Sequence, residues 1–180
     1  MNFRRTPWLL LAVPFLLVAA CAPAEEEEAA AEAEPAAETE AEVAQPDTTA
    51  EALWAHLEES DYQGNWSTWP GKGELYEGQE PHGMLLTTYL NPLALDALTN
   101  GAGSMPTGAI VVKENYMPDS TFAAATVMYK AAGYDPEHND WFWMKRNADG
   151  TVEAQGRVGM CYGCHAGGAD NDYLMTAPIK

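Results

Sequence analysis

The chain has 180 residues and a formal net charge of −18 at pH 7, from 27 acidic side chains against nine Lys and Arg. Such an acidic chain is unsuited to binding nucleic acid or to docking directly on anionic lipid, because both partners are themselves negative. The same charge permits a basic redox partner protein. There are three cysteines, so each of them carries information about compartment and chemistry.

The N-terminus has the features of an export signal. Arg4 and Arg5 form a short basic start, and Trp8–Ala20 is an apolar run too short to span a bilayer as a mature helix. The run ends in Val18-Ala19-Ala20-Cys21, which resembles the lipobox of bacterial lipoproteins, whose cysteine is lipidated after cleavage. We therefore predict that residues 1–20 are a lipoprotein signal peptide and that Cys21 carries the lipid.

An ordinary secretory signal that is cut before a stray cysteine is the alternative, and it would also export the chain. The residue after Cys21 is Ala22 rather than Asp, which by the usual bacterial sorting rule favours the outer membrane. We therefore expect an exported lipoprotein that is held at a membrane through its lipid anchor only. It would face the periplasm or the cell exterior.

The next segment has the composition of a tether. Ala22–Ala50 holds nine Glu and one Asp, has no Lys or Arg, and is interrupted by three prolines. Like charges repel and little apolar surface is available to bury, which is typical of a disordered segment. As a flexible chain it would span on the order of 30 Å. We predict that residues 21–50 are the lipidated cysteine and an acidic tether that holds the next domain off the lipid.

Residues 51–180 are long enough to bury a single hydrophobic core and are predicted to form one domain. Thr48 and Glu51 fit a capping box ahead of an apolar helical stripe, so a helix is expected to open the domain. Residues 61–78 are rich in Gly and Trp and are expected to be irregular.

The rest of the domain has the pattern of a β-sheet. Runs rich in β-branched and aromatic residues alternate with turn signals, and Asn147-Ala148-Asp149-Gly150 is a clear hairpin turn. Asn91-Pro92 caps a short helix at residues 93–98. The expected strands are residues 84–90, 109–116, 122–132, 141–146 and 151–158. The predicted fold class is therefore α+β, a mainly antiparallel β-sheet with a few short helices.

Near the C-terminus, Cys161-Tyr162-Gly163-Cys164-His165 has the C-x-x-C-H pattern of covalent c-type haem attachment. Residues three and four apart share a helix face, so both thiols can reach the porphyrin vinyl groups while the imidazole ligates the iron. A zinc site would need a fourth ligand, and a thioredoxin-like pair would need a strand-to-helix context early in the chain. We therefore predict one covalent haem c, bound by Cys161 and Cys164, with His165 as an axial iron ligand.

The position of the motif separates classes of haem protein. Fifteen residues follow His165, and Met175 lies on that short tail, so a downstream ligand would have difficulty reaching across the haem. The four-helix cytochromes c-prime also carry the motif near the C-terminus, but they need long heptad-like helices where this chain has hairpins. A sixth iron ligand, if there is one, is therefore expected to come from upstream of the motif.

Several segments, taken in order, point to one family. From Pro81 to Thr176 the chain resembles the cytochrome P-460 family and its relatives, the β-sheet cytochromes c-prime. The resemblance rests on Pro81-His82-Gly83, residues 106–114 (PTGAIVVKE), residues 128–134 (MYKAAGY), Asp140-Trp141-Phe142-Trp143, the haem motif and Asn171-Asp172-Tyr173. It implies an antiparallel sheet packed as a homodimer, with five-coordinate iron and an open distal pocket.

The resemblance also implies a chemistry. Members of the family oxidise hydroxylamine to nitrogen oxides, their relatives bind nitric oxide or other small gases, and in the enzymes a strand lysine is cross-linked to the porphyrin. The matching residue is Lys113, a candidate catalytic residue. Strand alternation places Val111 and Lys113 on one face. The plain alternative is a surface lysine paired to an acid.

Other side chains are weaker candidates. His82 is the best upstream nitrogen for a distal role, although a lone histidine between Pro and Gly is more often structural. Hydroxylamine oxidation needs a proton acceptor, for which Glu153 and Gln155 are candidates. His138 is expected to face solvent. Trp141, Phe142 and Trp143 alternate along a strand and cannot all face the haem.

Two classes of function remain open. The first is an enzyme resembling a hydroxylamine oxidoreductase, which would use a small nitrogen-oxide or hydroxylamine-type ligand and a redox partner protein. The second is a non-catalytic haem protein that binds nitric oxide or transfers electrons. A haem-free binding lipoprotein is disfavoured by the motif.

Overall fold

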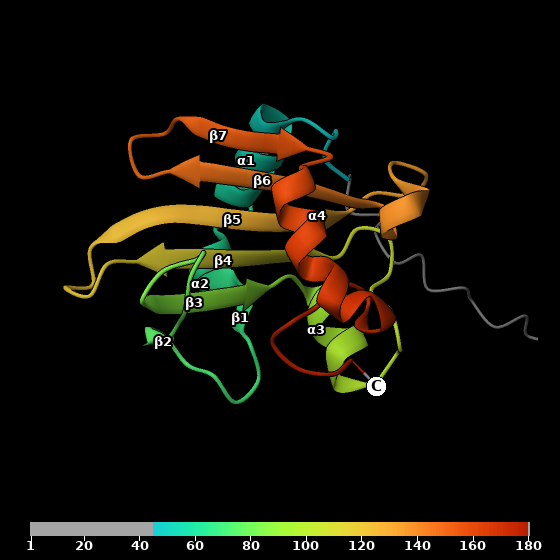
Figure 1. Cartoon of the computed structure of the whole chain (residues 1–180), viewed down its shortest axis with the longest axis horizontal. Coiled ribbons are helices and arrows are strands. Elements are labelled where there is room, and N and C mark those ends of the chain that lie inside the picture. Colours follow the sequence, from blue (N-terminus) through green and yellow to red (C-terminus); the bar gives the residue numbers. More distant parts are fainter. Residues whose placement is uncertain (1–44, 180) are drawn as a thin grey trace, which may run out of the picture. The chain divides into compact units, whose positions relative to one another are not determined.

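We analysed a computed structural model of the chain, which describes residues 45–179. The predicted signal peptide, the lipidated Cys21 and the tether up to residue 44 lie outside the described residues. The described part is built on a seven-stranded sheet in which every pairing is antiparallel, with short helices on both faces (Figure 1). The predicted α+β class is confirmed.

The sheet follows the chain order closely, because most neighbours are joined by hairpins. Its strand order is β1-β3-β4-β5-β6-β7, and β2 also pairs with β3. The strands are β1 Ser67–Thr68, β2 Tyr76–Glu77, β3 Leu85–Leu90, β4 Ile110–Tyr116, β5 Phe122–Lys130, β6 Trp141–Asn147 and β7 Val152–Gly156. The ends of the five longer strands lie within two residues of their predicted positions.

The helices are short and cover the two faces. They are α1 Ala50–Glu59, α2 Tyr62–Asn65, α3 Pro92–Thr99 and α4 Gly159–His165, with 3₁₀ turns η1 Pro136–His138 and η2 Ala166–Asn171. Figure 1 shows α1 behind the sheet and α4 in front of it. In the part of the chain that the structure covers, no helix combines the length and apolar character needed to cross a membrane.

Each face of the sheet has its own apolar core. Phe142 packs with the buried side of α1, in the cluster that contains Leu53 and Leu57. Trp141 and Trp143 belong to the other cluster, which includes residues of α3 and the C-terminal tail. The predicted alternation along this strand is therefore confirmed, and it divides β6 between a structural face and the face that carries the haem motif.

Two local predictions were wrong. Helix α1 is capped by Thr49, whose Oγ1 accepts a bond from the Ala52 amide at 3.2 Å, and not by Thr48. The stretch predicted as irregular contains α2, β1 and β2. Strands β1 and β2 are two residues each and exist through pairing with β3, a long-range contact that local sequence does not encode.

Two predicted boundaries were right, the helix start at Asn91 and the hairpin turn at residues 147–150. Asn91 begins α3, and its Oδ1 accepts bonds from the amides of Ala94 and Ile110, both at 3.0 Å. One side chain therefore fixes both the start of α3 and the start of β4. At the β6–β7 hairpin Gly150 has a φ of 87°, a conformation that glycine adopts without steric cost.

Candidate functional site

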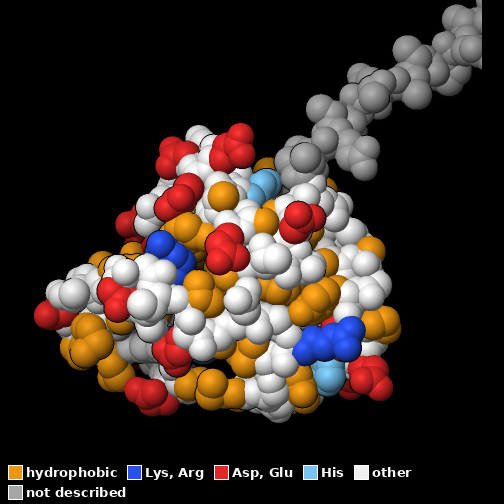
Figure 2. Space-filling model, turned by 90° about the horizontal axis from the view of Figure 1, so that it is seen from above, with side chains coloured by type: hydrophobic (Ala, Val, Ile, Leu, Met, Phe, Trp, Pro, Cys, Tyr) orange, Lys and Arg blue, Asp and Glu red, His pale blue; other side chains and the backbone are white. Residues whose placement is uncertain are grey.

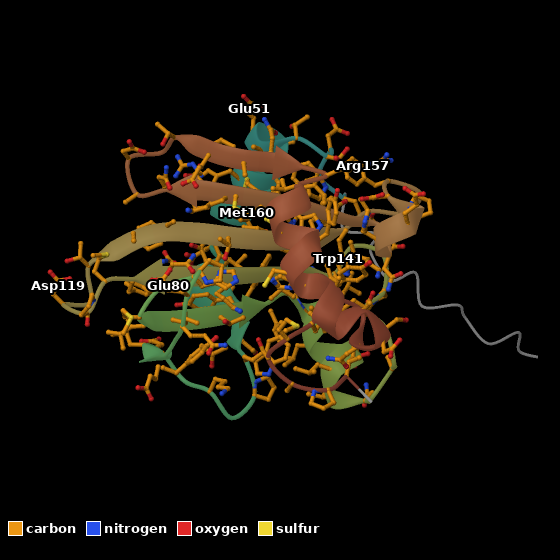
Figure 3. The ribbon with its side chains drawn as sticks, viewed as in Figure 1. Glu51, Glu80, Asp119, Trp141, Arg157 and Met160 are labelled. Atoms are coloured by element: carbon orange, nitrogen blue, oxygen red, sulfur yellow. The ribbon has the colours of Figure 1, made fainter. Side chains whose placement is uncertain are left out.

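A cavity of about 500 Å³ lies between the haem-motif helix and the sheet. Its walls come from α4, from strands β4, β5 and β6, from the loop before β3 and from the C-terminal tail. Met160 of α4 and Glu80 of the loop both line it and lie over the same face of the sheet (Figure 3). Cys161, Cys164 and His165 open into this cavity together, as their spacing predicted.

The orientation of His165 is set by one strong hydrogen bond. Its Nδ1 lies 2.7 Å from the main-chain oxygen of Tyr173, so Nδ1–H donates and the lone pair is left on Nε2. Burial lowers the pKa of His165, partly offset by this bond, and so favours the neutral ring. A neutral imidazole with a free Nε2, held by a partner behind it, is the arrangement that a metal-binding histidine requires.

The motif helix is held at its side by aromatic stacking. Tyr162 stacks on His138, with ring centres 3.8 Å apart and an interplanar angle of 24°. His138 also bonds to Asp135 at 2.9 Å through Nδ1. His138 was expected to face solvent, but its side chain is only 24% exposed, because its ring stacks on Tyr162.

Asp172 ties the C-terminal tail to the sheet and is 3% exposed. Its carboxylate accepts bonds from the Lys130 ammonium at 2.6 Å, the Met105 amide at 2.6 Å and the Asn139 amide group at 3.0 Å. Its main-chain oxygen accepts from the Trp141 indole at 2.9 Å. Because Tyr173 is the next residue, this anchor positions the carbonyl that orients His165.

The residues of the cavity fit a haem group. The two thiols of the motif and the free Nε2 of His165 share one wall. Trp143 is 3% exposed, and its indole N–H has no hydrogen-bond partner among residues 45–179. A buried donor without an acceptor is costly, and a haem carboxylate is an acceptor of the right kind. Trp143 also lies against His165, with ring centres 4.8 Å apart.

Lys113 lies on the cavity side of β4, opposite Thr88 and Thr126 on the neighbouring strands. Burial lowers the pKa of its amine. Within the described residues the Lys113 ammonium makes no ion pair or hydrogen bond. The alternative of a surface lysine paired to an acid does not fit this position.

His82 enters the cavity from the loop before β3. Its Nδ1 lies 3.3 Å from Thr126 Oγ1, and its ring centre is 6.1 Å from that of His165. Burial, followed by the nearby Lys113 and His165, lowers the pKa of His82 to about 4, so the ring is neutral at neutral pH. The loop that carries His82 also lies close to β4. Gly83 allows this, because a Cβ there would lie 3.0 Å from the Tyr116 carbonyl oxygen.

This geometry agrees with comparison to known proteins. The sequence model of the family described as Cytochrome P-460 matches residues 60–176, more than half of the chain. The chain belongs to the cytochrome P-460 family. The match covers the cavity walls and the motif, and it supports a c-type haem protein with a haem cofactor. A search of curated proteins found no match.

The two predicted proton acceptors of this cytochrome P-460 family member are not equivalent. Glu153 lines the cavity, but it is exposed and its carboxylate pairs with Lys145 at 2.9 Å. Gln155 does not line the cavity, because its Oε1 accepts a bond from the Ala50 amide of α1 at 2.8 Å. Gln155 was therefore a wrong candidate.

Sequence reasoning missed three residues of the site. Asp172 was noted only as part of a family segment, and its role as an anchor depends on partners 33 to 67 residues away. Asn115 and Thr126 were not singled out, although both line the cavity beside Lys113. The signal that could have found them is strand alternation: Asn115 is two residues after Lys113 on the same face.

Proposed function

We propose that this protein is an exported, lipid-anchored, mono-haem c-type cytochrome that oxidises a hydroxylamine-type compound at an open coordination site. The observation that carries this is the amine of Lys113, partly buried and without a partner among the described residues, in the cavity that the haem motif lines. At this position the enzymes of the family carry a cross-linked lysine. Haem would supply the iron that binds the ligand and takes up its electrons.

Each residue has a definable task in this proposal. Cys161 and Cys164 form the thioethers, and His165 presents Nε2 to the iron. The neutral ring of His82 can accept a proton from a ligand in the cavity. Lys113 would present its amine to the porphyrin edge, where the enzymes of the family carry their cross-link, and so help to hold the cofactor in a fixed position on the sheet.

An open iron site is supported by the place of Met175. The sulfur of Met175 lies against Gly168. A Cβ added to Gly168 would be 3.0 Å from that sulfur. Gly168 is three residues after His165, so Met175 is packed against the segment that follows the motif. The methionine downstream of the motif lines the cavity but packs against the segment that follows the proposed proximal ligand, which argues against its reaching across the haem.

Nitric oxide binding without catalysis is the second candidate, and the apolar walls favour it. Several buried apolar side chains line the cavity, and such a surface suits a gas without hydrogen-bond donors, such as nitric oxide. They are Val111, Met128, Trp143 and Leu174. Hydroxylamine turnover with an artificial electron acceptor, measured beside nitric oxide binding to the reduced protein, separates the two. Nitric oxide binding without turnover would leave gas binding or electron transfer.

Covalent attachment is the first testable prediction. Protein matured with haem-ligation machinery should show the mass of one added haem, because both thiols open into the cavity beside His165. Acid–acetone extraction should leave the colour with the protein. Replacing both Cys161 and Cys164 by Ala should release the colour to the solvent, and colour lost from the wild type would refute the thioethers.

Anchoring is the second prediction. Mature protein should begin at lipidated Cys21 and stay with membranes until the tether is cut. Cys21→Ser should abolish lipidation and membrane retention without removing haem, since residues 60–176 alone match the haem family. Recovery of the wild type as an unlipidated export product would contradict anchoring.

The proposed setting follows from charge and family. Acidic side chains outnumber basic ones on the face in Figure 2, which suits a basic redox partner protein and not a nucleic acid. The proposed location is the outer membrane, facing the periplasm or the cell exterior. A second copy of the chain is the proposed partner in a homodimer, which sedimentation of the haem-loaded protein would test.

A further inference from the structure

A second cavity, of about 400 Å³, is built on the face of the sheet that carries α1. Its walls are the C-terminal half of α1, helix α2, the end of β4 and the start of β5. Figure 1 shows α1 and the motif helix α4 on opposite sides of the sheet. Most of the lining side chains are aromatic or acidic, and they are Trp54, Tyr62, Tyr116 and Phe122 with Glu58, Asp61 and Glu114.

Glu114 is a buried carboxylate of this cavity and is 1% exposed. Its Oε1 accepts bonds from the Tyr62 hydroxyl at 2.8 Å and the Gln63 side-chain amide at 2.6 Å. Its Oε2 accepts a bond from the Tyr116 hydroxyl at 2.6 Å. Burial, followed by the charge of Glu114, raises the pKa of Tyr62, so this hydroxyl keeps its proton and remains a donor. All three partners donate, which suits a charged carboxylate.

No cation balances the charge of Glu114 within residues 45–179, where the ion pairs involve other acids. Arg146 is on the same face of the sheet, but its guanidinium lies over the Trp54 ring, 4.2 Å from the ring centre. Residues 22–44 contain no Lys or Arg. A buried charge without a counter-charge is costly, so a cavity that retains one is suited to receive a cation.

The chemistry of the walls selects the kind of cation. A carboxylate offers about four acceptor positions. Three positions of Glu114 are used, which leaves one on Oε2 for an N–H donor. Aromatic rings attract organic cations and also bury apolar chains. A metal ion is less suitable, because the described residues hold no group of three or more His, Cys, Asp or Glu that could bind one.

We propose that this second cavity binds a small primary ammonium ion, which donates an N–H bond to Glu114 Oε2 and packs its alkyl chain against the aromatic walls. Glu58 and Asp61 are exposed and line the same cavity, and their charge attracts cations to it. The site is separate from the haem motif and does not depend on the proposed function.

The test is isothermal titration calorimetry of the haem-loaded protein with butylammonium chloride, at constant ionic strength set by sodium chloride. Butanol has a similar chain without the charge, and tetramethylammonium has the charge without an N–H group. We expect butylammonium to bind and butanol to give no measurable binding. Tetramethylammonium should bind about ten-fold more weakly, because it cannot make the charge-assisted hydrogen bond.

Three variants identify the acceptor. Glu114→Gln keeps the size of the side chain but removes its charge, and it should lower butylammonium affinity by at least about ten-fold. Glu153→Gln removes an exposed carboxylate that lines the haem cavity instead, and affinity should stay within about two-fold. Gln63→Ala changes an exposed residue and frees a second acceptor position on Glu114, so affinity should rise about three-fold.

Each contrary result overturns a part of the proposal. A wild type that does not bind butylammonium, or binds butanol equally well, would refute the cation site. Equal binding of tetramethylammonium would refute the N–H donor, and undiminished binding to Glu114→Gln would show that another group holds the cation. If Glu114→Gln does not take up haem, Gln63→Ala decides, because affinity that does not rise would count against this carboxylate.

Discussion

Asp172→Ala is expected to lower the free energy of unfolding by about 3–5 kcal/mol, the cost typical of removing one partner of a buried ion pair. The Lys130 ammonium would lose its carboxylate, and the Met105 amide would lose its acceptor, both at 2.6 Å in the native fold. Urea unfolding of the haem-loaded protein measures the change.

Two further variants identify the cause. Asp172→Asn keeps an acceptor for the Met105 amide and should lose less. Glu153→Ala breaks the exposed pair with Lys145 and should change stability little. Because Tyr173 follows Asp172, the alanine variant should also alter the optical spectrum through His165. An unchanged unfolding midpoint would show that the tail is not held by this carboxylate.

Lys113→Ala is expected to abolish hydroxylamine oxidation, with a loss of at least about 100-fold, the scale on which a group acting at the reacting centre contributes. Peptide mapping of the wild type should find Lys113 on the haem peptide, and the variant should show a strongly shifted spectrum with intact thioethers. Burial disfavours the charged amine, so its removal should not destabilise the fold.

Lys145→Ala is the matched control, because Lys145 also lines the cavity but pairs with Glu153. It should retain activity and spectrum. An unmodified Lys113 together with no hydroxylamine turnover would end the enzyme proposal and leave gas binding or electron transfer. A stable six-coordinate iron that refuses nitric oxide would leave electron transfer alone.

The sequence predicted those features of the fold and of the site that depend on local pattern. Alternation along residues 110–116 and 141–147 and the turn at Gly150 were enough to predict these strands and to place Val111 and Lys113 on one face. The spacing of the motif was enough to bring Cys161, Cys164 and His165 to one cavity wall.

The contacts that orient His165 could not be predicted, because they depend on the conformation of the C-terminal tail. Asp172 and Tyr173 have φ angles of 53° and 64°, which non-glycine residues seldom adopt. This turn brings Asp172 to Lys130 and the Tyr173 carbonyl to His165. The indole N–H of Trp143, which finds no partner among residues 45–179, is also invisible in sequence, because only packing decides which polar groups find partners.

The acceptor behind His165 is a main-chain carbonyl and not a carboxylate. A carboxylate in that place draws the ring proton toward itself, which gives the imidazole partial anionic character and makes it a stronger electron donor to a metal. A neutral carbonyl draws the proton less. The proposed proximal ligand would therefore donate less electron density than one held by a carboxylate, and this would favour the ferrous state of a bound haem.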